Sequence, residues 1–250
     1  EKSAWAVVKG KIFYEATEIF LRFLKGDIFS SSEVGPKFIS KKDFRTPEAW
    51  QKVVDILGDE TIEKIEIEPY WNFEKVGVIP YDAPLNNLKL TIGSHDSYSQ
   101  IHANKFYPCG VFNLSITPTK EIEETHERMK VFYHSDGGEW NRSLMPRTVL
   151  VFINNNVNLT PEQQREKANE TARNALENYW KAIEGTLDPL KIQNAVNNAL
   201  IGNSGDLIEQ IKERFHPDDR LMLWFDFNNH NNEEIKNNMK MFMQDVASNL

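Results

Sequence analysis

The C-terminal part of the chain alternates short apolar runs with stretches in which apolar residues recur every three or four positions. Residues 221–225 are almost wholly apolar, as is typical of a parallel strand covered on both faces. From Ile235 the apolar residues return at Met239, Phe242 and Val246, which is the spacing of one helical face. The segment therefore predicts a buried strand, a polar loop and an amphipathic helix.

The same rhythm begins near residue 88. A capping box at Thr160 and Gln163, with Pro161 at the first helical position, predicts the helix after the third strand. Further helices are predicted from Pro189 to Leu200 and from Ser204 to Phe215. The predicted strands cover residues 88–92, 110–114, 148–153 and 221–227. Each is followed by a helical pattern, and this alternation is typical of a parallel α/β sheet or barrel.

The N-terminal part has a different pattern. Residues 12–24 carry apolar side chains at helical spacing, and Gly26 supplies a stop. Residues 31–87 are irregular and predict an insertion with a short helix, beginning near Pro47, and a hairpin. We expect one domain over residues 1–250, made of a helix at 1–30, this insertion, and four βα units at 88–250.

Composition narrows the function classes. The 250 residues are 40% hydrophobic, enough for a sizeable core, and the formal net charge of −8 argues against non-specific nucleic-acid binding. Cys109 is the only cysteine, which excludes an intrachain disulfide and fits a reducing cytoplasm. The histidines lack the spacing of a metal site, so we expect no metal, and no apolar run reaches the roughly 18 residues of a membrane span. The tryptophans are scattered, and we interpret them as core or subunit-contact residues.

Three strings resemble one family. They are LMLWFDFNNHNNEEIKNNMKMFMQDV at 221–246, LTIGSHDSYSQIHANKFYPCGVFNLSITPTKEIEETHERM at 90–129, and KIFYEATEIFLRFLKGDIFS at 11–30. Together they resemble the flavin-dependent luciferase-like monooxygenases, a TIM-barrel family related to bacterial luciferase. The resemblance implies an α/β fold of TIM-barrel-type (β/α) repeats, of which this chain is the second half with an irregular insertion.

A half barrel leaves sheet edges unpaired. We therefore expect a partner, which is a missing N-terminal barrel half, a second copy or a different subunit, and an oligomer. The chain begins at Glu1, and whether it is a fragment, a processed product or a piece of a larger polypeptide stays open.

The loop that follows the predicted strand at 88–92 is the main candidate site, because TIM-barrel sites lie at the C-terminal ends of strands. The resemblance implies that this loop receives the phosphate of flavin mononucleotide (FMN), with Ser94, His95, Ser97 and Ser99 as contacts; a deazaflavin is the alternative cofactor. Asp96 departs from that role, since a carboxylate repels a phosphate. Ser and Asp before a helix are also ordinary N-caps, so both interpretations stay open.

The leading hypothesis is part of a flavin-dependent monooxygenase that oxidises a small organic substrate with molecular oxygen. The alternative is a non-catalytic luciferase-like subunit that acts as a structural or flavin-binding partner. A hydrolase barrel using Asp226 is a third possibility, although no second acid pairs with it. No catalytic residue can be assigned.

Overall fold

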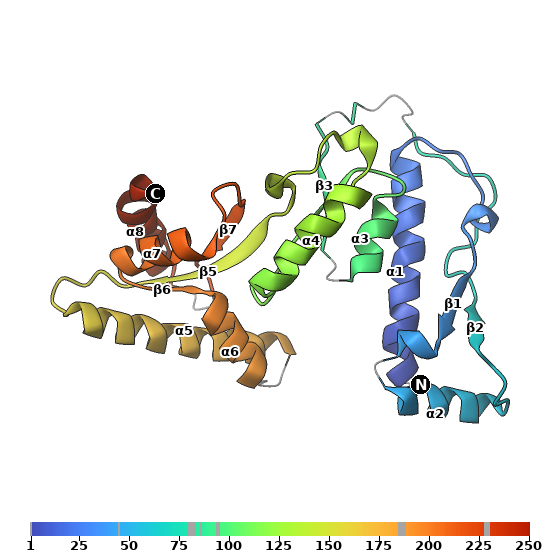
Figure 1. Ribbon diagram of the computed structural model, residues 1–250, viewed down its shortest axis with the longest axis horizontal. Helices are drawn as coiled ribbons and strands as arrows, with labels where there is room; N and C mark the ends of the chain where they lie inside the picture. Colours follow the sequence, from blue (N-terminus) through green and yellow to red (C-terminus); the bar gives the residue numbers. More distant parts are fainter. Residues whose placement is uncertain are drawn as a thin grey trace. The chain divides into compact units, whose positions relative to one another are not determined.

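The computed structural model describes residues 2–44, 46–79, 84–85, 87–93, 96–184, 189–227 and 231–250. Its contacts divide the chain into two compact units (Figure 1). Unit 1 comprises Glu1–Cys109 and Phe132–Glu139, and unit 2 comprises Gly110–Val131 and Trp140–Leu250. This is a division of contacts, and the single domain over residues 1–250 stays a prediction.

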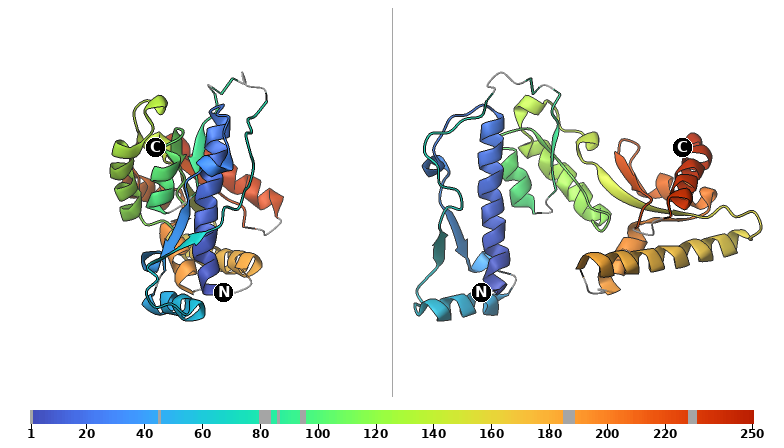
Figure 2. Two further views of the ribbon diagram at one scale, coloured as in Figure 1. Left: turned by 90° about the vertical axis from the view of Figure 1, so that its right-hand side faces the viewer. Right: turned by 180° about the vertical axis from the view of Figure 1, so that it is seen from behind.

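Unit 1 is built around a long helix. Its elements are α1 (Lys2–Leu24), β1 (Lys37–Ser40), α2 (Pro47–Leu57), β2 (Lys64–Ile67), β3 (Leu90–Ile92) and α3 (Ser97–Ala103). β1 pairs with β2 in antiparallel orientation (Figure 2). Because α2 lies between the two strands in the sequence, the pair differs from the predicted hairpin, whose strands a short turn would join. α1 begins ten residues before the predicted start at residue 12, because Ala4, Val7 and Val8 pack against the buried cluster around Trp50.

Unit 2 contains a parallel sheet centred on β5 (Arg147–Ile153), which pairs with β6 (Leu200–Gly202) on one side and β7 (Leu221–Trp224) on the other. β4 (Cys109–Val111) pairs with β3 in a separate two-stranded sheet. The helices that follow are α4 (Thr119–Phe132), α5 (Pro161–Glu184), α6 (Pro189–Asn198), α7 (Ser204–Arg214) and α8 (Asn232–Met241), with a π-helical turn at Phe242–Val246. Parallel pairing is confirmed for two of the predicted strands, β5 and β7, and the third strand of the sheet, β6, was not predicted.

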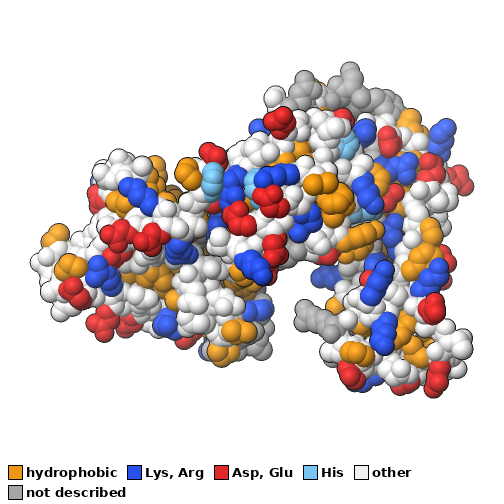
Figure 3. Space-filling view, viewed as in Figure 1, with side chains coloured by type: hydrophobic (Ala, Val, Ile, Leu, Met, Phe, Trp, Pro, Cys, Tyr) orange, Lys and Arg blue, Asp and Glu red, His pale blue; other side chains and the backbone are white. Residues whose placement is uncertain are grey.

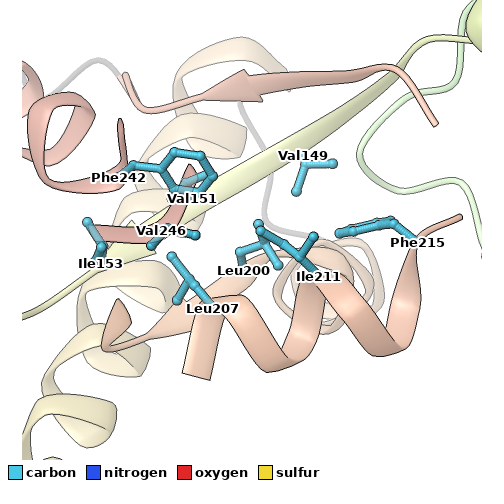
Figure 4. Close-up of a cluster of buried hydrophobic side chains, with 9 residues drawn as sticks. All are labelled: Val149, Val151, Ile153, Leu200, Leu207, Ile211, Phe215, Phe242 and Val246. Atoms are coloured by element: carbon cyan, nitrogen blue, oxygen red, sulfur yellow. The ribbon is translucent and has the colours of Figure 1, made fainter. Parts of the chain in front are cut away.

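Both faces of the β5 sheet are covered. Val149, Val151 and Ile153 point toward α7 and the C-terminal turn, where they pack with Leu207 and Val246 (Figure 4). Because side chains alternate along a strand, Leu150 and Phe152 point the other way and pack against α5 and α6. The described residues form no closed barrel, and this three-layer packing does not confirm the predicted half of a TIM barrel.

β6 was missed by the sequence pattern, which extended the preceding helix to Leu200. The backbone of Ile201 is hydrogen-bonded to a side chain of α7. Its N–H donates to Gln210 Oε1 at 3.1 Å, and its carbonyl accepts from Gln210 Nε2 at 2.8 Å. Arg214 also donates to the carbonyls of Asn198 and Ala199 at 2.7 and 2.8 Å. The outer edge of β6 is thus covered by side chains of α7.

The surface carries charges of both signs, with acidic and basic side chains interspersed on the face drawn in Figure 3. The negative balance of the chain is therefore spread rather than gathered there. Among the described helices, none combines the length and apolarity needed to cross a membrane.

Candidate functional site

The loop predicted to hold a phosphate is organised by Asp96. Asp96 is the N-cap of α3, and its carboxylate accepts the backbone N–H groups of Tyr98 at 3.3 Å and Ser99 at 2.9 Å. It also accepts the hydroxyls of Ser99 at 2.8 Å and Tyr14, from α1, at 2.6 Å. The donors that an anion would use at this helix start are therefore directed at a side chain of the protein itself.

The protonation states of this cluster follow from burial and hydrogen bonding. Burial alone would raise the pKa of Asp96, but the hydrogen bonds from Tyr14 and Ser99 outweigh it and hold the pKa below its usual value. Burial, together with the carboxylate of Asp96, raises the pKa of the Tyr14 hydroxyl. Asp96 is thus charged and Tyr14 neutral at pH 7, so the cluster repels an anion.

The four residues predicted to contact the phosphate differ in their surroundings. Ser94 and His95 lie outside the described residues. Ser97 is the exposed first residue of α3, whereas Ser99 is buried and bonded to Asp96. In the described part of the loop the residues satisfy one another and do not fit a phosphate group. The assignment of Ser94, His95, Ser97 and Ser99 to the cofactor stays a prediction.

His102 lies one turn further along α3 and is buried. Its Nε2 is 3.3 Å from the carbonyl oxygen of Tyr14 and 3.6 Å from a carboxylate oxygen of Glu18. Burial, reinforced by the charge of Lys37, lowers the pKa of His102 to about 4, so near neutral pH the ring is uncharged and its contact with Glu18 is not an ion pair. Nε2 then carries the hydrogen and donates to the Tyr14 carbonyl. No group of three metal-ligating side chains occurs among the described residues.

Unit 2 holds a cavity of about 160 Å³ on the face of the sheet that α5 covers. Its lining comes from four separate segments: Leu114, Ser115, Ile116, Thr148, Leu150, Leu176, Tyr179, Trp180, Trp224 and Phe227. None of these residues carries a charge, and their polar side-chain atoms are the hydroxyls of Ser115, Thr148 and Tyr179 and the indole nitrogens of Trp180 and Trp224. The cavity therefore suits a neutral, mostly apolar molecule.

Aromatic rings define one side of this cavity. The rings of Trp224 and Phe227 are stacked at 6.3 Å between centroids, and Tyr179 meets Trp224 edge to face at 5.6 Å. The sequence shows that Tyr179 and Trp180 are adjacent aromatic residues in one predicted helix. Their proximity to Trp224 could not be predicted, because it depends on how β7 is aligned with β5. Our sequence interpretation of these tryptophans as core or subunit-contact residues missed the cavity. Asp226, the acid considered for a hydrolase, is exposed and is not among the lining residues.

Comparison with known proteins gives a likeness of fold. No protein-family model and no curated protein sequence matches the chain. The crystal structure of monooxygenase RslO1 from Streptomyces bottropensis is similar with a TM-score of 0.50 and 16% sequence identity, over 84% of this chain and 63% of that chain. The oxygenating constituent of 3,6-diketocamphane monooxygenase from Pseudomonas putida, a type II Baeyer-Villiger monooxygenase in complex with FMN, gives a TM-score of 0.42, 12% identity, and coverage of 84% and 65%.

The chain therefore spans less than two thirds of the length of either solved structure. At 16% identity, the likeness to RslO1 concerns the fold. This mixed α/β chain has a fold that resembles that of a monooxygenase.

Proposed function

We propose that the chain is part of a flavin-dependent, luciferase-like monooxygenase that oxidises a small organic substrate with molecular oxygen. The observation that carries the proposal is the likeness of fold to the monooxygenase RslO1 over 84% of the chain, which agrees with the family resemblance of the sequence strings. FMN, or a deazaflavin in its place, would supply the reaction with oxygen, and the protein would orient the substrate and exclude water.

The described residues limit what this chain contributes to cofactor binding. The donors around Asp96 are taken, and a cavity of about 160 Å³ is small beside the roughly 300–1,000 Å³ of sites for drug-sized ligands. We therefore assign no catalytic step through the flavin to these residues. The proposal places the cavity on the substrate side of the reaction.

A partner forms part of the proposal. The missing N-terminal barrel half, or a second subunit, would supply the remaining surface for the cofactor and pair the free strand edge of the sheet. On this view the complete enzyme is an assembly, or a longer polypeptide, in which this chain provides the second half.

The alternative function is a non-catalytic subunit with a structural or flavin-binding role. The observation that favours it is the carboxylate of Asp96, which occupies the helix start where the resemblance implies a phosphate. A subunit that has lost cofactor contacts would keep the fold without the activity.

Absorbance and oxygen consumption separate these functions. The purified chain is titrated with FMN while the shift of the flavin absorbance bands is followed, and oxygen uptake is then measured with chemically reduced FMN, with and without the chain. Saturable FMN binding with product formation from an added organic substrate supports the monooxygenase. Binding without product supports the non-catalytic subunit. If FMN does not bind to the chain, even together with its natural partner, the monooxygenase and the flavin-binding subunit both fail, and a structural subunit is what is left.

A further inference from the structure

We propose that the cavity in unit 2 binds a neutral, single-ring aromatic molecule that carries one oxygen substituent, the class of which phenol is the simplest member. The inference names a substrate class for the proposed monooxygenase and rests on that function for its catalytic meaning. Binding itself depends only on the residues around the cavity.

The size of the cavity sets the size of the molecule. An apolar cavity of roughly 150 Å³ accommodates benzene in other proteins, and the cavity here measures about 160 Å³. One six-membered ring with a small substituent fills this space, whereas a fused three-ring system such as a flavin does not.

The lining favours an aromatic ring over a polar molecule of the same size. Tyr179, Trp180, Trp224 and Phe227 contribute ring surfaces, and Leu150, with Leu176, closes the cavity toward the core of the sheet. Rings prefer edge-to-face or offset-stacked neighbours at about 4.5–7 Å, and the wall already holds the Tyr179–Trp224 and Trp224–Phe227 pairs in these geometries. A further ring would extend the same arrangement.

Two hydroxyl groups call for an oxygen on the ligand. Ser115 and Thr148 belong to the lining residues, and a hydroxyl both donates and accepts a hydrogen bond. A phenolic hydroxyl would donate to one of them or accept from it, and an apolar ligand of the same size would leave them without this contact.

The lining also excludes charge. No Lys, Arg, Asp or Glu is among the lining residues, and a buried ion without a counter-charge would be strongly destabilised. Lys191 lies over the ring of Trp180, with its Nζ 5.4 Å from the ring centroid, so its charge faces the indole and not a carboxylate of a ligand. A phenol fits these conditions because it is neutral at pH 7.

The test compares phenol with toluene, which has the same number of heavy atoms and a methyl group in place of the hydroxyl. Dissociation constants are measured by isothermal titration calorimetry on the whole chain. Ser115→Ala and Thr148→Val, made together, remove the two hydroxyls and keep similar side-chain volumes. Leu114→Phe narrows the cavity at a residue that is 40% exposed, and Val157→Phe makes a similar change at a position that is 91% exposed and not part of the lining.

We expect both ligands to bind the unmodified chain, and Leu114→Phe to weaken both at least ten-fold while Val157→Phe weakens neither. The double variant should shift the phenol-to-toluene affinity ratio about five-fold toward toluene, the value of one neutral hydrogen bond. If the double variant does not fold, Ser115→Ala and Thr148→Val are measured singly, and at least one of them should shift the ratio in the same direction.

Failure to bind either ligand, equal weakening by Leu114→Phe and Val157→Phe, or an affinity ratio that loss of the hydroxyls leaves unchanged would overturn the inference. Its failure is distinguishable from failure of the proposed function. If the chain binds phenol but never FMN, the inference about the cavity holds and the proposed monooxygenase function fails. If the chain supports FMN-dependent oxygenation but does not bind phenol, the proposed function holds and the inference about the cavity fails.

Discussion

At the scale of single residues, burial decides the protonation state of His102. The ring is enclosed by α1 and α3, next to Glu18, Lys37 and Tyr98. Desolvation disfavours the charged ring, and Lys37 adds repulsion, so the pKa of His102 falls to about 4 from an unperturbed value of about 6.5. The nearby carboxylate of Glu18 does not reverse this balance.

His102 therefore makes stability depend on pH. Between about pH 6.5 and 4 the unfolded state binds a proton that the folded state does not, so the free energy of unfolding should decrease as the pH falls, by about 3 kcal/mol in total from this residue. Urea unfolding at a series of pH values measures it. His102→Gln should flatten this part of the profile, and His216→Gln, at a half-exposed position, should not. A profile unchanged by His102→Gln would contradict the explanation.

At the scale of elements, small residues set how closely the helices approach the sheet. Ala172 of α5 and Ala195 of α6 are fully buried, and both belong to the cluster that packs on Leu150 and Phe152 of β5. A larger side chain at this contact would have to displace the helix, because protein interiors are close-packed.

Ala172→Leu should lower the free energy of unfolding by about 1–3 kcal/mol, as overpacking of a filled core does. Ala182→Leu is the matched control, since Ala182 lies on an exposed face of the same helix and should change stability by less than about 0.5 kcal/mol. Chemical denaturation of both variants measures the difference. Equal effects would indicate that helix propensity, and not packing, is responsible.

Local signals account for most of the elements that were predicted. The capping box of α5 is confirmed, since Gln163 accepts the N–H of Thr160 at 2.9 Å and Thr160 accepts the N–H of Gln163 at 3.3 Å. α7 begins at Ser204 as predicted, and its N-cap is Asn203, whose side chain accepts the N–H of Asp206. β6 has only three residues, too few to show an alternation that separates a strand from a helix end.

At the scale of the whole molecule, unit 2 is held together by a charged network between distant segments. Arg142 donates to Glu123 at 2.6 and 2.9 Å and to Asp219 at 2.7 Å, and Arg147 lies 3.8 Å from Asp219. The Asp219 side chain is 5% exposed, whereas that of Glu123 is 48% exposed. The two carboxylates should therefore differ greatly in their effect on stability.

Asp219→Ala should cost about 3–5 kcal/mol, because it leaves the buried guanidinium of Arg147 without its counter-charge and removes a buried partner of Arg142. Glu123→Ala should cost less than about 1 kcal/mol, since water replaces a half-exposed carboxylate. Urea unfolding with and without added salt tests the pair, and the Asp219 contribution should be the less salt-sensitive. Similar costs for the two variants would argue against burial as the cause.

Long-range arrangement is what the sequence could not supply. The cavity brings Ile116, Thr148, Trp180 and Trp224 together from four segments, and their meeting depends on the β5–β7 register and on where α5 crosses the sheet. For the candidate loop after β3, the residues were identified from the sequence but their role was ambiguous. Its Ser and Asp residues suit both a cap and a phosphate site, and the Tyr14 hydroxyl that also donates to the Asp96 carboxylate is 82 residues away in the sequence.

The side-chain amide of Gln210 has a consequence for assembly. It bonds both the N–H and the carbonyl of Ile201 that point away from β5. These two groups are the ones that a further strand next to β6 would need, so no strand can pair with Ile201 at this edge. Within unit 2 as described, extension by main-chain pairing is consequently one-sided, and a chain that completes the sheet has to dock alongside β7. Any such complex would therefore add its strand beyond β7 and not beyond β6.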